Sequence, residues 1–145
     1  MRKLAKRDVM RVIDANLNRS REALRVCEDI ARFAMNSRAL TSQLKSVRHA
    51  VSGIAKSSAV PLKALPASRD SEGDCLRRSR FESEMKRDTL SDIFAANIER
   101  AKESLRVLEE LFKLIDTQSS SKFCGLRYKV YTIEKRGAKR LNDAD

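Results

Sequence analysis

Two pairs of polar side chains in this chain could hold an anion. Asn16 is followed three positions later by Arg19, and Asn97 stands in the same relation to Arg100. A guanidinium can bind a phosphate through two parallel N–H groups, and an amide can orient the ligand or the arginine. We therefore predict that both pairs line a pocket for a negatively charged ligand. The alternative is that they pair with acidic residues of neighbouring helices and fix the packing register.

A second candidate for chemistry is the pair of carboxylates Glu28 and Asp29. They could act as metal-binding or acid–base groups at the rim of the same pocket. On a helical projection, however, they lie on the more polar arc, with Arg25 close enough to form ion pairs. A solvated helix face is therefore the plainer interpretation, and both remain open.

A third candidate lies between the two copies, where Arg69 and Asp70 are followed by Asp74. Mg²⁺ is commonly bound by one or two carboxylates, with water and substrate phosphates completing its coordination. Asp70 and Asp74 could therefore act as catalytic and metal-binding groups, with Arg69 contributing to phosphate binding. The alternative is a solvated turn around Gly73.

The repeated pairs belong to a longer internal duplication. Residues 13–30 and 94–111 are identical at eight of eighteen positions, whereas unrelated segments would share roughly one. The segments that follow also match, and they place Arg48 and Arg127 at equivalent positions. We expect these two arginines to support phosphate binding.

Apolar residues in both copies are spaced alternately four and three positions apart, which is typical of helices packed in a bundle. In the first copy they occupy more than half of the helix circumference, so this helix must contact more than one neighbour. Thr89 and Asp92 have the spacing of a capping box. We predict an all-α chain of two tandem helical hairpins, forming a pseudo-twofold four-helix bundle. The expected helices cover about 8–36, 38–57, 89–116 and 120–136, with turns at 36–37 and 117–120.

The whole chain, residues 1–145, is predicted to be one domain. Repeat 1 covers about 8–60 and repeat 2 about 89–140, and a polar loop at about 61–88 joins them. A connection of this length in a compact domain is usually functional or disordered. We interpret it as an active-site loop.

The composition narrows the class of protein. Apolar residues make up 41% and charged residues 35%, with two prolines and four glycines, which favours helices over strands or disorder. The three cysteines lack C-x-x-C spacing and indicate neither a disulfide framework nor a zinc site. No apolar run approaches the roughly 20 residues of a membrane span. We therefore expect a cytoplasmic protein without membrane contact.

The formal net charge of +11 implies an anionic partner: nucleic acid, an acidic protein surface or a phosphorylated small molecule. A basic nucleic-acid-binding module is the main alternative to a small-molecule site. It is less favoured because it does not explain the repeated pairs and no docking motif is present. The contacts to nucleic acid would come from Arg77, Arg78, Arg80, Lys86 and Arg87.

The wide apolar arcs also allow a homodimer.

The run DANLNRSREALRVCED at 14–29 resembles the signature of a small helical domain that is commonly fused ahead of bacterial thiamin-phosphate synthase. Further motifs of that family are matched in the right order at 69–74, 96–110 and 126–134. The chain is similar to the hydroxymethylpyrimidine-phosphate kinase family over most of its length. It departs from the family after Asp74, where Cys-Leu-Arg-Arg-Ser-Arg is more basic than expected.

The resemblance implies a thiamin-biosynthesis enzyme that converts hydroxymethylpyrimidine phosphate to the diphosphate, with ATP as co-substrate and Mg²⁺. It implies thiamin-phosphate synthase as a functional partner. A non-catalytic homologue that only binds thiamin intermediates is a further alternative. A synthase activity is not expected of this chain, because the synthase barrel needs about 200 or more residues of its own.

Overall fold

The computed structural model describes residues 6–78 and 85–143 of the 145-residue chain. Four long helices account for most of this part: α1 (Lys6–Phe33), α2 (Arg38–Ser57), α5 (Leu90–Phe112) and α6 (Thr117–Asn142). A short 3-10 helix, η1 (Leu62–Ala64), and one turn of helix, α3 (Leu65–Ser68), follow α2. The predicted all-α class is confirmed. Within the described ranges, no helix is both long enough and apolar enough to cross a membrane.

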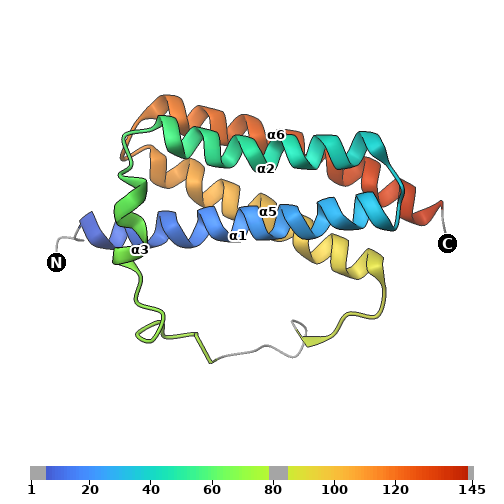
Figure 1. The fold of residues 1–145 in the computed structure, drawn as a ribbon, viewed down its shortest axis with the longest axis horizontal. Coiled ribbons are helices and arrows are strands. Elements are labelled where there is room, and N and C mark those ends of the chain that lie inside the picture. Colours follow the sequence, from blue (N-terminus) through green and yellow to red (C-terminus); the bar gives the residue numbers. More distant parts are fainter. Residues whose placement is uncertain (1–5, 79–84, 144–145) are drawn as a thin grey trace.

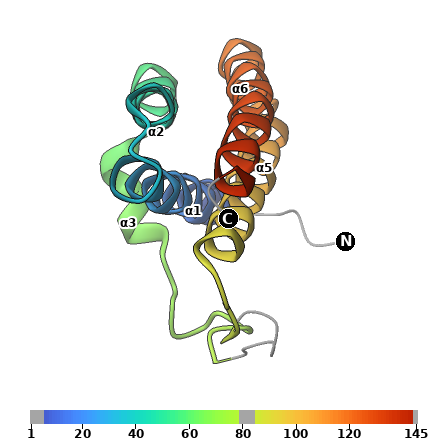
Figure 2. The same ribbon diagram turned by 90° about the vertical axis from the view of Figure 1, so that its right-hand side faces the viewer.

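The helices form two layers (Figures 1 and 2). The chain between α3 and α5, residues 69–89, is called the connecting segment, and its described parts lie on one side of the layers. The hairpins α1–α2 and α5–α6 stand beside each other, so that α1 packs on α5 in one layer and α2 faces α6 in the other. Residues 69–78, which follow α3, and residues 85–89, which precede α5, lie on the face of the α1–α5 layer that is opposite α2 and α6. Because α1 packs against α2, α3 and α5, the prediction that it contacts more than one neighbour is confirmed.

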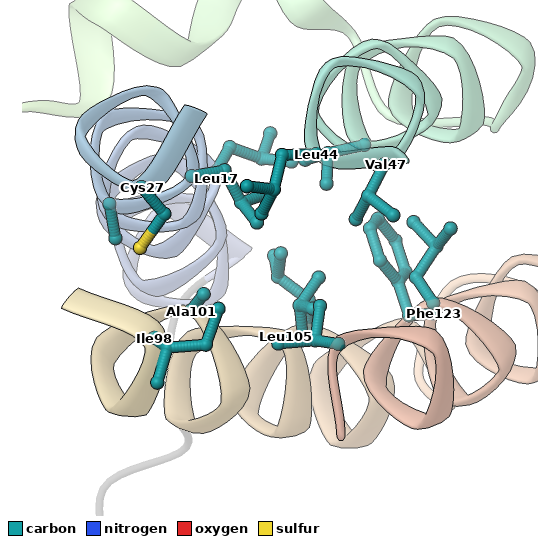
Figure 3. Close-up of a cluster of buried hydrophobic side chains, with 14 of the residues drawn as sticks. Leu17, Cys27, Leu44, Val47, Ile98, Ala101, Leu105 and Phe123 are labelled. Atoms are coloured by element: carbon teal, nitrogen blue, oxygen red, sulfur yellow. The ribbon is translucent and has the colours of Figure 1, made fainter. Parts of the chain in front are cut away.

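All four long helices contribute to one hydrophobic core (Figure 3). Leu17, Leu44, Leu105 and Phe123 come from different helices and are each no more than 1% exposed. Burying a side chain of this size stabilises the fold by roughly 1.5–3 kcal/mol. Cys27 belongs to the same core, where burial raises the pKa of its thiol to about 12. This cysteine therefore behaves as an apolar side chain.

The helix starts follow from local capping groups. Thr89 and Asp92 form the predicted capping box at the start of α5. Ser37 caps α2, whose predicted range of 38–57 is confirmed. The predicted turn at 117–120 is wrong, because the Asp116 carboxylate accepts the Ser119 N–H at 2.6 Å and starts α6 at Thr117.

The helix ends differ more from the predictions. Helix α1 ends at Phe33, and α5 ends at Phe112, both earlier than predicted. Helix α6 continues to Asn142, beyond the predicted end at residue 136. Gly137 permits this extension to pass close to the N-terminal part of α5, since a Cβ at this position would overlap the ring of Phe94.

Candidate functional site

A cleft of about 520 Å³ lies between α1 and α5. Its ten lining residues form five pairs, and the members of each pair are 81 positions apart in the sequence. The cleft therefore lies where the two copies of the repeat face each other. The pairs are Asn16 with Asn97, Arg19 with Arg100, Glu22 with Glu103, Ala23 with Ser104, and Val26 with Val107.

The two asparagines are held by their own helices. Asn16 donates from Nδ2 to the Val12 carbonyl at 2.9 Å, and Asn97 donates to the Ile93 carbonyl at 2.8 Å. These bonds fix each amide and leave its oxygen able to accept a hydrogen bond from a ligand. The alternative of pairing with acidic residues from neighbouring helices is not what the structure shows for the asparagines.

The two arginines have a different environment. Arg19 and Arg100 both line the cleft and are exposed there. In the part of the chain that the structure describes, neither guanidinium has a hydrogen-bond or ion-pair partner. A cleft with two free guanidiniums on opposite walls can bind an anion without breaking an existing ion pair.

A second cavity, of about 610 Å³, lies between α1 and the connecting segment. Asn16 and Arg19 line this cavity as well as the cleft, so the two spaces meet at these residues. The connecting segment contributes three residues predicted from the sequence, Arg69, Asp70 and Asp74. The remaining lining residues are Asp8, Arg11, Val12, Asp14, Ala15, Asn18 and Ser71.

Asp14 is a residue of this cavity that the sequence reasoning missed. Its carboxylate is buried and accepts two hydrogen bonds from Arg69, at 2.6 Å from Nε and at 2.9 Å from Nη2. These bonds and the charge of Asp14 raise the pKa of the Arg69 guanidinium. The pair attaches the connecting segment to α1, so Arg69 acts here as an anchor and not as a free phosphate ligand.

The signal for Asp14 was present in the sequence. A carboxylate one position after the apolar Ile13, in a segment whose second copy has Ala95 at the equivalent position, suggests a role specific to the first copy. Asn18 donates to Asp14 at 3.5 Å, and Arg21 donates to Asn18 at 3.0 Å. The second copy has the equivalent bond from Lys102 to Glu99 but has Ala95 in place of Asp14, so the link to a buried carboxylate is specific to the first copy.

Asp70 and Asp74 both line the second cavity, and each also shapes the local backbone. Asp70 accepts the Gly73 N–H at 2.8 Å, and Asp74 accepts the Leu76 N–H at 3.0 Å. A Cβ at position 73 would overlap the Asp70 carboxylate, so a larger residue there would displace this side chain from its bond to the Gly73 N–H.

The cavity does not provide a complete metal site. The described residues contain no group of three or more acidic, histidine or cysteine side chains that could hold a metal ion. Two carboxylates with further oxygens from a phosphate do suit Mg²⁺. Asp70 and Asp74 alone would therefore supply only part of the coordination of such an ion.

Glu28 and Arg48 lie outside both cavities and bind each other. Arg48 donates from Nε to the buried Glu28 carboxylate at 2.8 Å, and Arg127 donates to the buried Glu109 at 3.1 Å in the second hairpin. The prediction of a solvated face is wrong for both glutamates, since the second helix of each hairpin covers them. Asp29 remains partly exposed, at 3.4 Å from Arg25 on the next turn.

The fold and the cleft thus define a class: an all-α protein built from a duplicated hairpin, with free cationic groups where the copies meet. Comparison with family models gives the particular family. The model described as the ThiD2 family matches residues 11–136, and the chain belongs to that family. No solved structure matches it.

Several curated relatives share the chain's sequence. The thiamine-phosphate synthase of Thermosynechococcus vestitus is 37% identical over 125 residues, which cover 86% of this chain and 34% of the relative. That of Rhodopirellula baltica is 37% identical over 130 residues, covering 86% and 33%. That of Synechocystis sp. is 36% identical over 126 residues, covering 87% and 35%. The chain thus spans about a third of the length of these relatives.

Proposed function

We propose that the protein is a thiamin-biosynthesis kinase that phosphorylates hydroxymethylpyrimidine phosphate to the diphosphate with ATP. The family and the similarity to thiamine-phosphate synthases support a place in thiamin biosynthesis. The observation that carries the kinase reaction is the meeting of two cavities at Arg19. A phosphoryl donor and a phosphorylated acceptor both bring negative charge to one point, and an unpaired guanidinium there offsets their repulsion.

The two cavities suit different ligands. The cleft between α1 and α5 is lined by the carboxylates Glu22 and Glu103 as well as by two free guanidiniums and two fixed amides. The guanidiniums and amides suit the acceptor phosphate and its ring. The second cavity has the carboxylates Asp70 and Asp74, which suit the nucleotide with its Mg²⁺. When bound, the metal ion would neutralise charge on the nucleotide phosphates. Arg19 would then contact the phosphoryl group in transit, and Arg100 the acceptor.

The reaction needs no strong general base. An oxygen of the acceptor phosphate forms a bond to the γ-phosphorus of ATP, and the bond from that phosphorus to the β-phosphate oxygen breaks to release ADP. A phosphate monoester has a second pKa near 6, so its attacking oxygen is already deprotonated at neutral pH. Catalysis by positioning and charge neutralisation is therefore sufficient. Glu28 is not needed as a base and is occupied by Arg48.

The test is turnover by the purified chain with hydroxymethylpyrimidine phosphate and Mg-ATP. We expect ADP release, with the pyrimidine diphosphate visible by phosphorus NMR. Binding of the pyrimidine phosphate without ADP release would instead indicate a non-catalytic homologue. A folded protein that neither binds nor turns over the substrate would refute the proposal.

Three matched variants locate the reaction. Arg19→Gln should lower kcat by roughly 10²–10³-fold, as removal of a charge-stabilising group typically does. Arg100→Gln should act mainly on KM for the pyrimidine phosphate. Arg25→Gln is the control, because it removes the same charge from an exposed position of α1 outside both cavities. Equal effects of Arg19→Gln and Arg25→Gln would contradict the assignment.

A further inference from the structure

The excess positive charge of the molecule lies almost entirely in one layer. Helix α2 has four basic residues and no acidic one, and α6 has seven basic residues and one acidic one, Glu134. Together these two helices have a net charge of +10, against +11 for the whole chain. Helices α1 and α5 together have ten basic and ten acidic residues, and so no net charge. The charge is therefore on the side of the molecule away from the connecting segment (Figure 1).

Most of these cations are not used inside the protein. Arg48 and Arg127 bind buried glutamates, and Arg140 donates to the Met35 carbonyl. Lys122 lies near Asp116. The other seven have no hydrogen-bond or ion-pair partner among the described residues. They are Arg38, Lys45, Lys56, Lys129, Lys135, Arg136 and Lys139.

A groove between α2 and α6 lies within this surface. It has a volume of about 400 Å³, with Lys129 and Arg136 on the α6 wall and serine hydroxyls on the α2 wall. On the outside of α6, the ring of Tyr128 is 62% exposed, with the Arg127 guanidinium 5.2 Å from its centroid.

We propose that the α2–α6 layer binds single-stranded nucleic acid through its phosphate backbone. Seven free cations over helices of about 30 and 39 Å form an electrostatic footprint for a polyanion. Of these cations only Lys129 and Arg136 line the groove, and Lys135 lines a cavity between α5 and α6, so one docked acidic helix could not reach them all. A flexible strand can, and an exposed tyrosine beside cations provides a surface for base stacking.

Nucleic-acid binding and small-molecule binding, which were alternatives in the sequence analysis, can both occur because the two surfaces lie in different layers. The cavities lie on the α1–α5 layer and the cationic surface on the α2–α6 layer, so nucleic acid and small-molecule binding do not compete for residues. The cations predicted for nucleic acid lie elsewhere: Arg77 and Arg78 are in the connecting segment, and Arg80 lies outside the described residues. Residues 69–88 contain six basic and six acidic residues and have no net charge.

The test is fluorescence anisotropy with a labelled 20-nucleotide single-stranded RNA at 50, 100 and 200 mM NaCl. We expect log K to fall linearly with log salt, with a slope of about −3 or steeper, since each phosphate contact contributes about −0.7. The triple variant Lys45→Gln, Lys129→Gln, Arg136→Gln should make the slope shallower by about 2 and weaken binding at 100 mM salt at least about tenfold. Tyr128→Ala should weaken binding about tenfold without changing the slope.

The control is Arg7→Gln, Lys63→Gln, Lys113→Gln, which removes the same charge from outside this layer. Circular dichroism checks that each variant is folded. The proposal is overturned if the RNA does not bind at 50 mM salt, or if both triple variants weaken binding equally. It is also overturned if poly-glutamate competes as well as RNA at equal charge, or if phosphatidylglycerol vesicles bind and RNA does not.

Discussion

The first hairpin, α1 with α2, and the second, α5 with α6, share their internal ion pairs but differ where the connecting segment meets them. In both, an arginine of the second helix binds a buried glutamate of the first, Arg48 with Glu28 and Arg127 with Glu109. Only the first has the buried Asp14, whose place is taken by Ala95 in the second.

The difference shows which features each copy needs to fold and which serve the site. The residues that both copies retain hold the two helices of each hairpin together and line the cleft between α1 and α5. The residue that differs, Asp14, binds Arg69 and so attaches the connecting segment to the first hairpin. The duplicated fold thus yields a symmetric cleft and an asymmetric cavity, which suits the proposed reaction between two different ligands.

The largest effect on stability is expected from breaking the shared ion pair. Arg48→Met and Arg127→Met each leave a buried carboxylate without its main partner, so each should lower the free energy of unfolding by about 2 kcal/mol. This is less than the 3–5 kcal/mol typical of fully buried pairs, because Arg25 and Arg106 remain near the glutamates. Urea unfolding at pH 7 measures it. Arg25→Met, at the exposed end of the same carboxylate, should cost under about 1 kcal/mol.

Similar losses for Arg48→Met and Arg127→Met would support equivalent roles in the two hairpins. If one of them left the stability unchanged, the two ion pairs would not be equivalent, and the comparison of the hairpins would fail at that point.

A smaller effect on stability, but a clear one on the connecting segment, is expected from Asp14→Ala. This change gives the first hairpin the residue of the second and frees Arg69. Trypsin should then cleave after the exposed Arg77 and Arg78 on the order of tenfold faster, because local opening no longer breaks the charged hydrogen bonds. Global stability should change by less than about 1 kcal/mol, because the substitution removes the buried charge of Asp14 and its pairing with Arg69 at the same time.

The reverse change, Ala95→Asp, is the matched control for this experiment. It places a carboxylate at the exposed equivalent position of α5, and should leave the cleavage rate unchanged. Unaltered proteolysis of Asp14→Ala would show that Arg69 does not anchor the segment.

What the sequence could predict depends on how local the cause is. Thr89 and Asp92 of the capping box are three positions apart, and the box was predicted correctly because both partners are in the same turn. The cleft pairs Asn16, Arg19, Asn97 and Arg100 come together because the repeat itself places them on equivalent faces.

Contacts between distant segments could not be predicted in this way. The bond from Arg69 to Asp14 joins residues 55 positions apart, and it depends on the path of a segment without helical periodicity. Glu28 lay on the polar arc of an isolated helix, and only packing of α2 over that arc makes it buried. Such partners depend on tertiary packing, which periodicity does not describe.

A last difference between the hairpins is the helix cap at each hairpin turn. The cap is the neutral Ser37 in the first hairpin and the ionisable Asp116 in the second. Hydrogen bonds from the Ser119 N–H and hydroxyl lower the pKa of Asp116 below its ordinary value. Because the folded-state pKa is depressed, the stabilisation is present above about pH 4 and is lost as the pH falls through the folded pKa. Only the second hairpin should therefore have a cap that depends on pH.

Asp116→Asn tests this, since asparagine keeps the cap but not the charge. The melting temperature of the variant should lie below that of the wild type at pH 7, and the difference should disappear near pH 2.5. Ser37→Ala, by contrast, should cost about 1 kcal/mol at either pH, because its cap has no titrating group. A difference for Asp116→Asn that persisted at pH 2.5 would mean that the carboxylate stabilises α6 through its shape and not its charge, which would make the two caps equivalent.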